Sequence, residues 1–322
     1  MSARAERLLR ALVPAAALLA FIVVVVGAYV RLSDAGLGCP DWPLCYGKPL
    51  PQASHSALGH AGALERAWKE MGHRYLAGAL GALIFVIAGV SWAARRFRFH
   101  ASALAVLVVL QATLGMWTVT MLLKPAIVTL HLLGGMATFA LLVLLSLRQV
   151  AFPANPAASR IRAAAASALV VLAIQIALGG WVSANYAALA CPDLPGCLGH
   201  ALPPMDFANA FHVFRDLGRT REGELLPLEA LVAIHWTHRM FAMVAVGAAL
   251  GASARAWRTP SLAPAGILVA ALALLQLGLG IGNVLLQLPL ALAAAHNAGA
   301  ALLLAALVVL NFFAFKRLSF PQ

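Results

Sequence analysis

The chain has 322 residues, of which 62% are hydrophobic and only 11% are charged. A soluble domain with so few charges could not cover its surface with polar groups, so this composition excludes an ordinary soluble enzyme and indicates a protein that resides in the lipid bilayer. The formal net charge of +12 would suit a nucleic-acid-binding protein. The Lys and Arg residues, however, fall in short clusters between apolar runs, so no nucleic-acid partner is expected.

Eight apolar stretches follow one another along the chain, each roughly 20 residues long, which is the length that crosses a hydrocarbon core about 30 Å thick. They cover about 11–30, 72–93, 102–122, 127–147, 163–184, 230–252, 262–286 and 290–314. No small-residue cleavage site follows the first stretch convincingly, so we expect a retained helix rather than a signal peptide.

Basic residues cluster at the N-terminus and in alternate loops. The clusters are at 4–10, 95–98, 148–162, 255–258 and 316–317. The positive-inside rule therefore places both termini in the cytoplasm of a bacterial inner membrane. The two long loops, about 31–71 and 185–229, then face the periplasm, and they hold all four cysteines.

The sequence contains an internal repeat. Adding 165 to the residue number superposes Glu70, His73, Arg74, Gln111, Gly115 and His131 on His235, His238, Arg239, Gln276, Gly280 and His296. An offset of 152 superposes the first helices and the two cysteine loops. The offset rises to 165 after these loops, because the outer loop of the second half is longer. We therefore predict an all-α polytopic membrane protein whose eight transmembrane helices form two pseudo-symmetric four-helix bundles, residues 1–150 and 151–322, related by an axis along the membrane normal.

Four histidines, His73, His131, His238 and His296, fall within the first turns of the second and fourth helices of each half. Polar side chains in lipid are costly and normally face the bundle interior. Two imidazoles at one level across a bundle are suited to bind haem iron on both axial sides. The alternative is that each histidine only forms a hydrogen bond between helices. Zinc is disfavoured, because no third ligand clusters with either pair.

Charged residues beside these histidines differ between the halves. Glu70 stands one turn before His73, whereas the second half has His235 at that position. A carboxylate beside a haem pocket can accept protons or stabilise positive charge, although Glu70 could also be a solvated carboxylate at the helix entrance. Arg74 and Arg239 either extend to the membrane surface or pair with a haem propionate. His235 is a further candidate for contact with a propionate or with the haem ligands.

Each outer loop carries a Cys-x5-Cys pair, Cys39 with Cys45 and Cys191 with Cys197. Thiols on the oxidising side of a membrane tend to become disulfides. Pairing within each loop is the simplest of the three connectivities that four cysteines allow. A structural disulfide and a redox-active pair are both compatible with this spacing.

Taken together, these residues resemble the haem A synthase family, whose bacterial and mitochondrial members convert haem O to haem A. The resemblance rests on Glu70-x-x-His73-Arg74, His131, His238-Arg239, His296, Gly27 and Arg31 ahead of the first cysteine loop, and the two-fold repeat. It covers nearly the whole chain, and the set of motifs at these spacings is specific.

The resemblance implies oxidation of the methyl group at porphyrin position 8 to a formyl group through hydroxylated intermediates. It places a resident haem b between His238 and His296, and the substrate haem O between His73 and His131 with Glu70 at the reacting edge. The family associates the loop cysteines with a disulfide. Expected partners are the enzyme that makes haem O and oxidase assembly factors. Small residues on the helix faces also permit a homo-oligomer.

Two other functions are compatible with parts of the sequence. A dihaem b-type cytochrome that only transfers electrons explains the four histidines but not the difference between Glu70 and His235. A disulfide-generating membrane oxidoreductase explains the cysteines but leaves the histidines without a role.

Overall fold

The computed structural model describes residues 3–52, 62–152 and 155–316. Within these ranges, eight helices are long and apolar enough to cross a membrane, which confirms the eight predicted spans and the all-α class. They are α1 (Ala3–Leu32), α2 (Ala63–Ala93), α3 (Arg98–Thr120), α4 (Pro125–Arg148), α5 (Arg162–Ala184), α7 (Leu228–Trp257), α8 (Ala263–Leu285) and α9 (Leu290–Phe315).

Short helical turns lie in the connections between the long helices. They are η2 (Pro156–Ile161), η3 (Ala187–Leu189), α6 (Phe207–Ala210) and η4 (Pro260–Leu262). Of these, η3 and α6 belong to the second outer loop, so part of that loop is folded onto the helix ends. Helical turns as short as these contain no long apolar run, so the hydropathy pattern did not predict them.

Helix α2 begins at Ala63, well before the predicted start at about 72, so the end of the predicted loop 31–71 is helical. An ion pair between Lys69 and Glu65 at 2.7 Å lies along this extension. Pairs spaced four residues apart stabilise a helix. The apolar run marks only the part of a helix that lies in hydrocarbon, and α2 continues beyond it.

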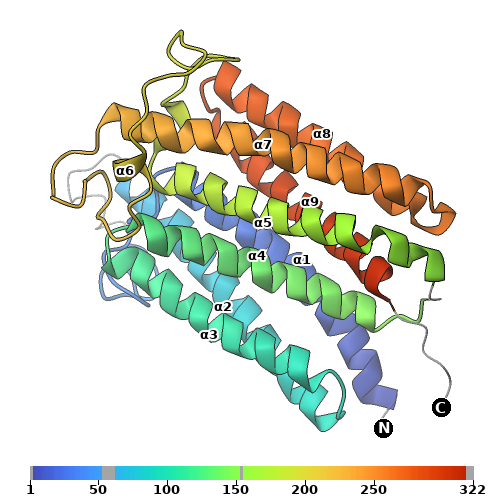
Figure 1. The fold of residues 1–322 in the computed structure, drawn as a ribbon. Coiled ribbons are helices and arrows are strands. Elements are labelled where there is room, and N and C mark those ends of the chain that lie inside the picture. Colours follow the sequence, from blue (N-terminus) through green and yellow to red (C-terminus); the bar gives the residue numbers. More distant parts are fainter. Residues whose placement is uncertain (1–2, 53–61, 153–154, 317–322) are drawn as a thin grey trace.

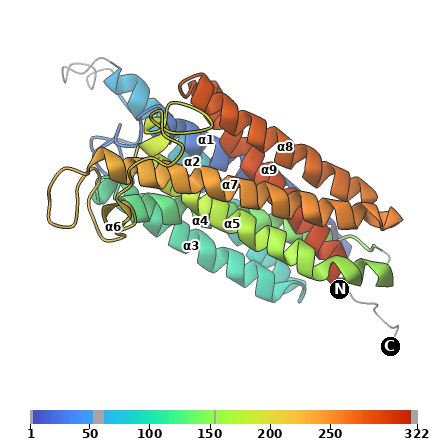
Figure 2. The ribbon, with the colours of Figure 1, turned by 45° about the horizontal axis from the view of Figure 1, so that its top comes forward.

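The eight long helices pack as two groups of four. Helices α1, α2, α3 and α4 contact one another in a ring, as do α5, α7, α8 and α9, and the two rings meet where α4 contacts α5 and α9 and where α1 contacts α9. Figures 1 and 2 show that α1 begins and α9 ends at one end of the molecule, whereas α6 and the long loops lie at the other end.

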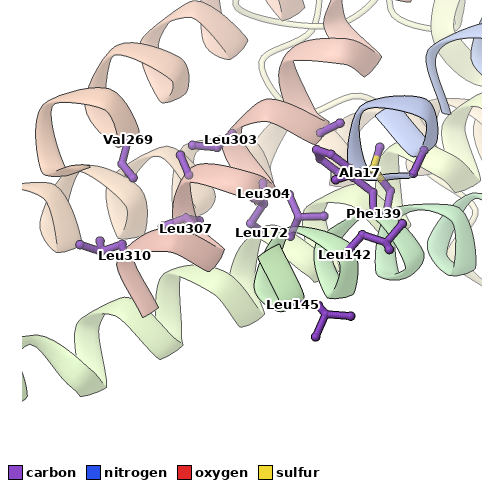
Figure 3. Packing of buried hydrophobic residues seen from close by; sticks show 14 of the residues in the cluster. Ala17, Phe139, Leu142, Leu145, Leu172, Val269, Leu303, Leu304, Leu307 and Leu310 are labelled. Carbon is purple, nitrogen blue, oxygen red and sulfur yellow. The ribbon is translucent and has the colours of Figure 1, made fainter. Parts of the chain in front are cut away.

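The two rings share one hydrophobic core. Leu304, Leu307 and Leu310 of α9 are buried in the same cluster as Leu172 of α5 and Phe139 of α4. Figure 3 shows these side chains converging from several helices. The two halves are therefore packed together along α9 rather than joined by a polar interface.

The connection within the second helical hairpin of each ring adopts the same backbone turn. Leu122 and Leu123 between α3 and α4 have φ of 51° and 58°, and Gln287 and Leu288 between α8 and α9 have φ of 56° and 62°. These pairs are related by the offset of 165. A left-handed conformation is uncommon for residues other than glycine, so its recurrence marks the two hairpins as equivalent.

Replacing a core leucine of α9 should destabilise the protein far more than replacing a surface leucine of the same helix. Leu307 is 0% exposed, whereas Leu302 is 42% exposed. We expect Leu307→Ala to lower the free energy of unfolding by about 2–5 kcal/mol and Leu302→Ala by no more than about 0.5 kcal/mol. Thermal unfolding in detergent measures both, and equal effects would contradict the central position of α9.

Candidate functional site

The first histidine pair lies across the first helical ring. His73 of α2 and His131 of α4 have ring centroids 6.4 Å apart, and their planes are nearly perpendicular, at 88°. Both residues are half-buried, and the Nδ1 atom of each is buried without a hydrogen-bond partner among the described residues. The structure therefore brings together the two imidazoles that the sequence paired.

The second pair, His238 of α7 and His296 of α9, occupies the corresponding helices of the second ring. Both residues are half-buried. Nδ1 of His296 is also buried and unpartnered. Among the described residues, no group of three or more His, Cys, Asp or Glu side chains could hold a metal ion.

Each of the four imidazoles lies against a glycine of a neighbouring helix. A Cβ atom at Gly27, Gly115, Gly179 or Gly280 would lie 2.7, 3.2, 3.0 or 3.4 Å from Cε1 of His73, His131, His238 or His296, respectively. A larger residue at the tightest of these positions would displace the ring. Because these four glycines have no side chain, the imidazoles can lie close to the neighbouring helix backbone. The sequence had not indicated this role for Gly179, although it matches Gly27 at the offset of 152.

Glutamine side chains hold the backbone next to these histidines. Gln111 donates from Nε2 to the carbonyl oxygen of His131 at 2.9 Å. Gln175 donates to the carbonyl oxygen of His238 at 3.1 Å, and its Nε2 also lies 3.1 Å from Nδ1 of that ring. The sequence analysis missed Gln175, because the offset of 152 places Val23 at the equivalent position and the repeat therefore gave no signal.

Glu70 binds the first cysteine loop to α2. Its side chain is buried, with the residue 4% exposed. Oε2 accepts a hydrogen bond from the backbone N–H of Cys39 at 2.8 Å, and Oε1 accepts one from Arg74. Glu70 is therefore not a solvated carboxylate at the helix entrance, which was one of the two expectations for it.

His235 forms the equivalent link in the second half. It is 5% exposed, and its Nδ1 accepts a hydrogen bond from the backbone N–H of Cys191 at 3.3 Å. Glu70 and His235 thus differ in chemistry but accept from the same backbone position of their loops. This contact gives His235 a structural role that the sequence alone did not suggest.

The two arginines bind the carbonyl groups of the same loops. Arg74 donates from Nη1 to the carbonyl oxygens of Asp41 at 2.8 Å and of Leu44 at 2.7 Å. Arg239 donates to the carbonyl oxygen of Gly196 at 3.1 Å and to that of Asp193. Each guanidinium group therefore holds a cysteine loop against its helix. Pairing of either arginine with a haem propionate stays a prediction.

The cysteines form disulfides within each loop, Cys39 with Cys45 and Cys191 with Cys197, which is the simplest of the connectivities that the sequence left open. All four cysteines are fully buried.

An aspartate closes each loop. Asp41 accepts from the N–H groups of Tyr46 and Gly47, and Asp193 from those of Leu198 and Gly199. The N–H groups of Gly199 and Leu198 hold the pKa of Asp193 below its ordinary value. Because the folded-state pKa is lowered, this contribution to stability is present above the unfolded pKa and is lost as the pH falls through the folded value.

Removing the Glu70 carboxylate should destabilise the protein, because the Arg74 guanidinium and the N–H of Cys39 lose their acceptor. We expect Glu70→Ala to lower the free energy of unfolding by about 3–5 kcal/mol. Glu70→Gln keeps one acceptor oxygen and should cost less. His235→Ala removes a neutral acceptor and should cost about 1–3 kcal/mol. Thermal unfolding in detergent checks this order, and wild-type stability of Glu70→Ala would rule out the link.

The chain resembles known proteins over most of its length. Residues 10–308 match the model of the COX15-CtaA family, described as a cytochrome oxidase assembly protein. The chain is 41% identical to the haem A synthase of Shewanella oneidensis over 314 residues, which cover 92% of this chain and 94% of the relative. It is also 31% identical to the haem A synthase of a Caulobacter species over 325 residues, with 90% and 91% covered. The match to the family model and these relatives show that the chain belongs to the COX15-CtaA family.

Proposed function

We propose that this protein is a haem A synthase, a membrane enzyme that oxidises a methyl substituent of haem O to the formyl group of haem A. The observation that carries the proposal is the 41% identity to a haem A synthase over 92% of the chain. The histidine pairs on facing helices support it, because two imidazoles on opposite sides of a haem can bind its iron at both axial positions.

The residues of the first ring fit a haem. Two imidazoles face each other from α2 and α4 with 6.4 Å between ring centroids, and Gly27 and Gly115 leave room against them. A buried Nδ1 atom without a partner on both His73 and His131 indicates side chains that are retained for something other than helix packing. We therefore assign the substrate haem O to this pair.

The residues of the second ring fit a haem in the same way, and we assign a resident haem b to His238 and His296. Gly179 and Gly280 lie against these rings, and Gln175 fixes the backbone and Nδ1 of His238. A haem b held here would supply one-electron transfer. The contact of Gln175 with an imidazole distinguishes the second ring of helices from the first. A hydrogen bond to an imidazole that binds a metal tunes the basicity of that imidazole.

Glu70 is the residue that we propose to act on the substrate. It lies one turn before His73 on α2, and each of its oxygens accepts one of the two hydrogen bonds described above. These fixed bonds orient the carboxylate, which can then accept a proton as the methyl carbon is oxidised.

We infer that both termini lie in the cytoplasm and both disulfide loops in the periplasm. Helix α1 begins and α9 ends at one end of the bundle (Figure 1), which also holds the connections with the basic clusters, whereas both cysteine loops lie at the opposite end. Haem O and haem A would then bind near the periplasmic surface, because His73 and His238 lie in the loop-side turns of their helices. Partners that deliver haem O or accept haem A should approach through the membrane.

The proposal is tested by expressing the protein with and without a haem O source and identifying the extracted haems by chromatography and mass. We expect haem A or its hydroxylated precursor from the wild type. Glu70→Gln and His73→Ala should lose these products while haem b remains, because the resident site lies in the other half. His238→Ala should lose haem b.

Two results would overturn the proposal. Two equivalents of unmodified haem b, with no haem O or haem A under any condition, would favour an electron-transferring dihaem cytochrome. Thiol oxidation that depends on the cysteines and persists without haem would favour a disulfide-generating oxidoreductase. Folding of each variant is checked by thermal unfolding, so that a lost product is not mistaken for a lost fold.

The glycines against the imidazoles give a test of the division between the halves. Gly27→Ala should lower binding of the substrate haem, and Gly179→Ala should lower the haem b content. The loss should be larger at Gly27, where the added Cβ would lie 2.7 Å from Cε1 of His73, than at Gly179, where it would lie 3.0 Å from Cε1 of His238. Gly78 of α2 and Gly247 of α7 have open space at the Cβ position and are the matched controls. Haem absorbance relative to the amount of folded protein measures the substrate haem and the haem b that each variant binds. Equal losses in the control variants would contradict the positioning role.

A further inference from the structure

A cavity of about 590 Å³ opens at the end of the molecule opposite the disulfide loops. It lies between α4, α5 and α9, at the junction of the two helical rings. Leu141 and Leu144 of α4, Leu169 of α5, and Val308 and Phe312 of α9 form its apolar wall. None of the sites described above uses this cavity.

Two cations line the same cavity. Arg148 ends α4, and Lys316 directly follows α9. Lys316 donates from Nζ to the carbonyl oxygen of Phe152 and lies over the rings of Phe152 and Phe312 at 5.3 and 5.6 Å. Arg148 is exposed. No Asp or Glu is among the lining residues, so the two positive charges are not neutralised within the cavity.

The polar residue of the wall is already committed to the protein. Asn311 donates from Nδ2 to the carbonyl oxygens of Ala165 at 2.9 Å and Leu307 at 2.8 Å, which ties α9 to α5. The cavity therefore presents an apolar wall and two cations, one contributed by each ring. No lining residue is a His, Cys or Met, so nothing there would ligate a haem iron.

We propose that this cavity binds an anionic phospholipid of the adjoining leaflet, with the phosphate between Arg148 and Lys316 and an acyl chain along the leucine wall. Basic pockets between transmembrane helices are suited to anionic headgroups. A single phosphate would relieve the repulsion between two like charges that face one cavity. Because the charges come from α4 and α9, the bound lipid would also bridge the two rings.

The test is native mass spectrometry of the full-length protein in detergent, titrated with phosphatidylglycerol or phosphatidylcholine. We expect preferential binding of phosphatidylglycerol, reduced about 25-fold in Arg148→Gln/Lys316→Gln, since each cation near the surface contributes a factor of about five. Arg255→Gln/Arg258→Gln is the matched control. It removes two exposed charges at the same end of the molecule and should keep the preference.

A second variant separates the acyl-chain wall from the charges. Leu144→Phe reduces the cavity and keeps both cations, and it should weaken binding of phosphatidylglycerol without changing unfolding of the lipid-free protein. Glycerol phosphate, a headgroup without acyl chains, should not compete. Equal binding of both lipids, equal loss in the control variant, or full competition by glycerol phosphate would each overturn the proposal. None of these measurements depends on haem, so they stand apart from the test of the enzymatic activity.

Discussion

The rest of this structure depends on the requirement that polar groups inside a bilayer find partners within the protein. Four imidazoles lie in membrane-spanning helices, and three of them bury an Nδ1 atom without a hydrogen-bond partner among the described residues. Such groups are costly unless a ligand uses the side chain. Each of the four imidazoles lies against a glycine of a neighbouring helix, and the proposed function gives these side chains a haem to bind. The two disulfide loops close the same end of the bundle.

The repeat gives both halves one framework, and the differences between the halves are few and local. Glu70 and His235 accept a hydrogen bond from the same backbone position of their loops, but only Glu70 brings a carboxylate. Gln175 contacts the ring of His238 where the first half has Val23. Glu70 lies one turn before His73 on α2, and Gln175 contacts the ring of His238 from α5. A duplicated scaffold with altered neighbours of its ligands is what two haems with different tasks would need, which agrees with the proposed division into a substrate site and a resident site.

Sequence reasoning predicted the parts of this protein that depend on hydropathy and periodicity. The eight spans and the pairing of His73 with His131 follow from apolar length and spacing, and the structure agrees with both. The early start of α2 was missed, because a helix can continue outside the hydrocarbon without an apolar run. The contact of Glu70 with Cys39 was missed because it joins residues 31 apart through a backbone group that no side-chain pattern reveals. The cavity beside Arg148 depends on how three helix ends meet, which only the packed structure specifies.

The attachment of each disulfide loop has a consequence for how the protein matures. Arg74 binds loop carbonyls on either side of the turn between Cys39 and Cys45, and Glu70 binds the first of these cysteines, while His73 lies between them on the same helix. An open, reduced loop would leave a buried carboxylate and a buried guanidinium with fewer partners, so α2 would be less firmly seated. Oxidation of the thiols is therefore thermodynamically linked to the rigidity of α2 around His73, the proposed haem ligand. Under the proposed haem assignment, a newly made chain would bind a porphyrin with full affinity only after the loop has closed, and the order of cofactor loading would then depend on the redox conditions around the loop.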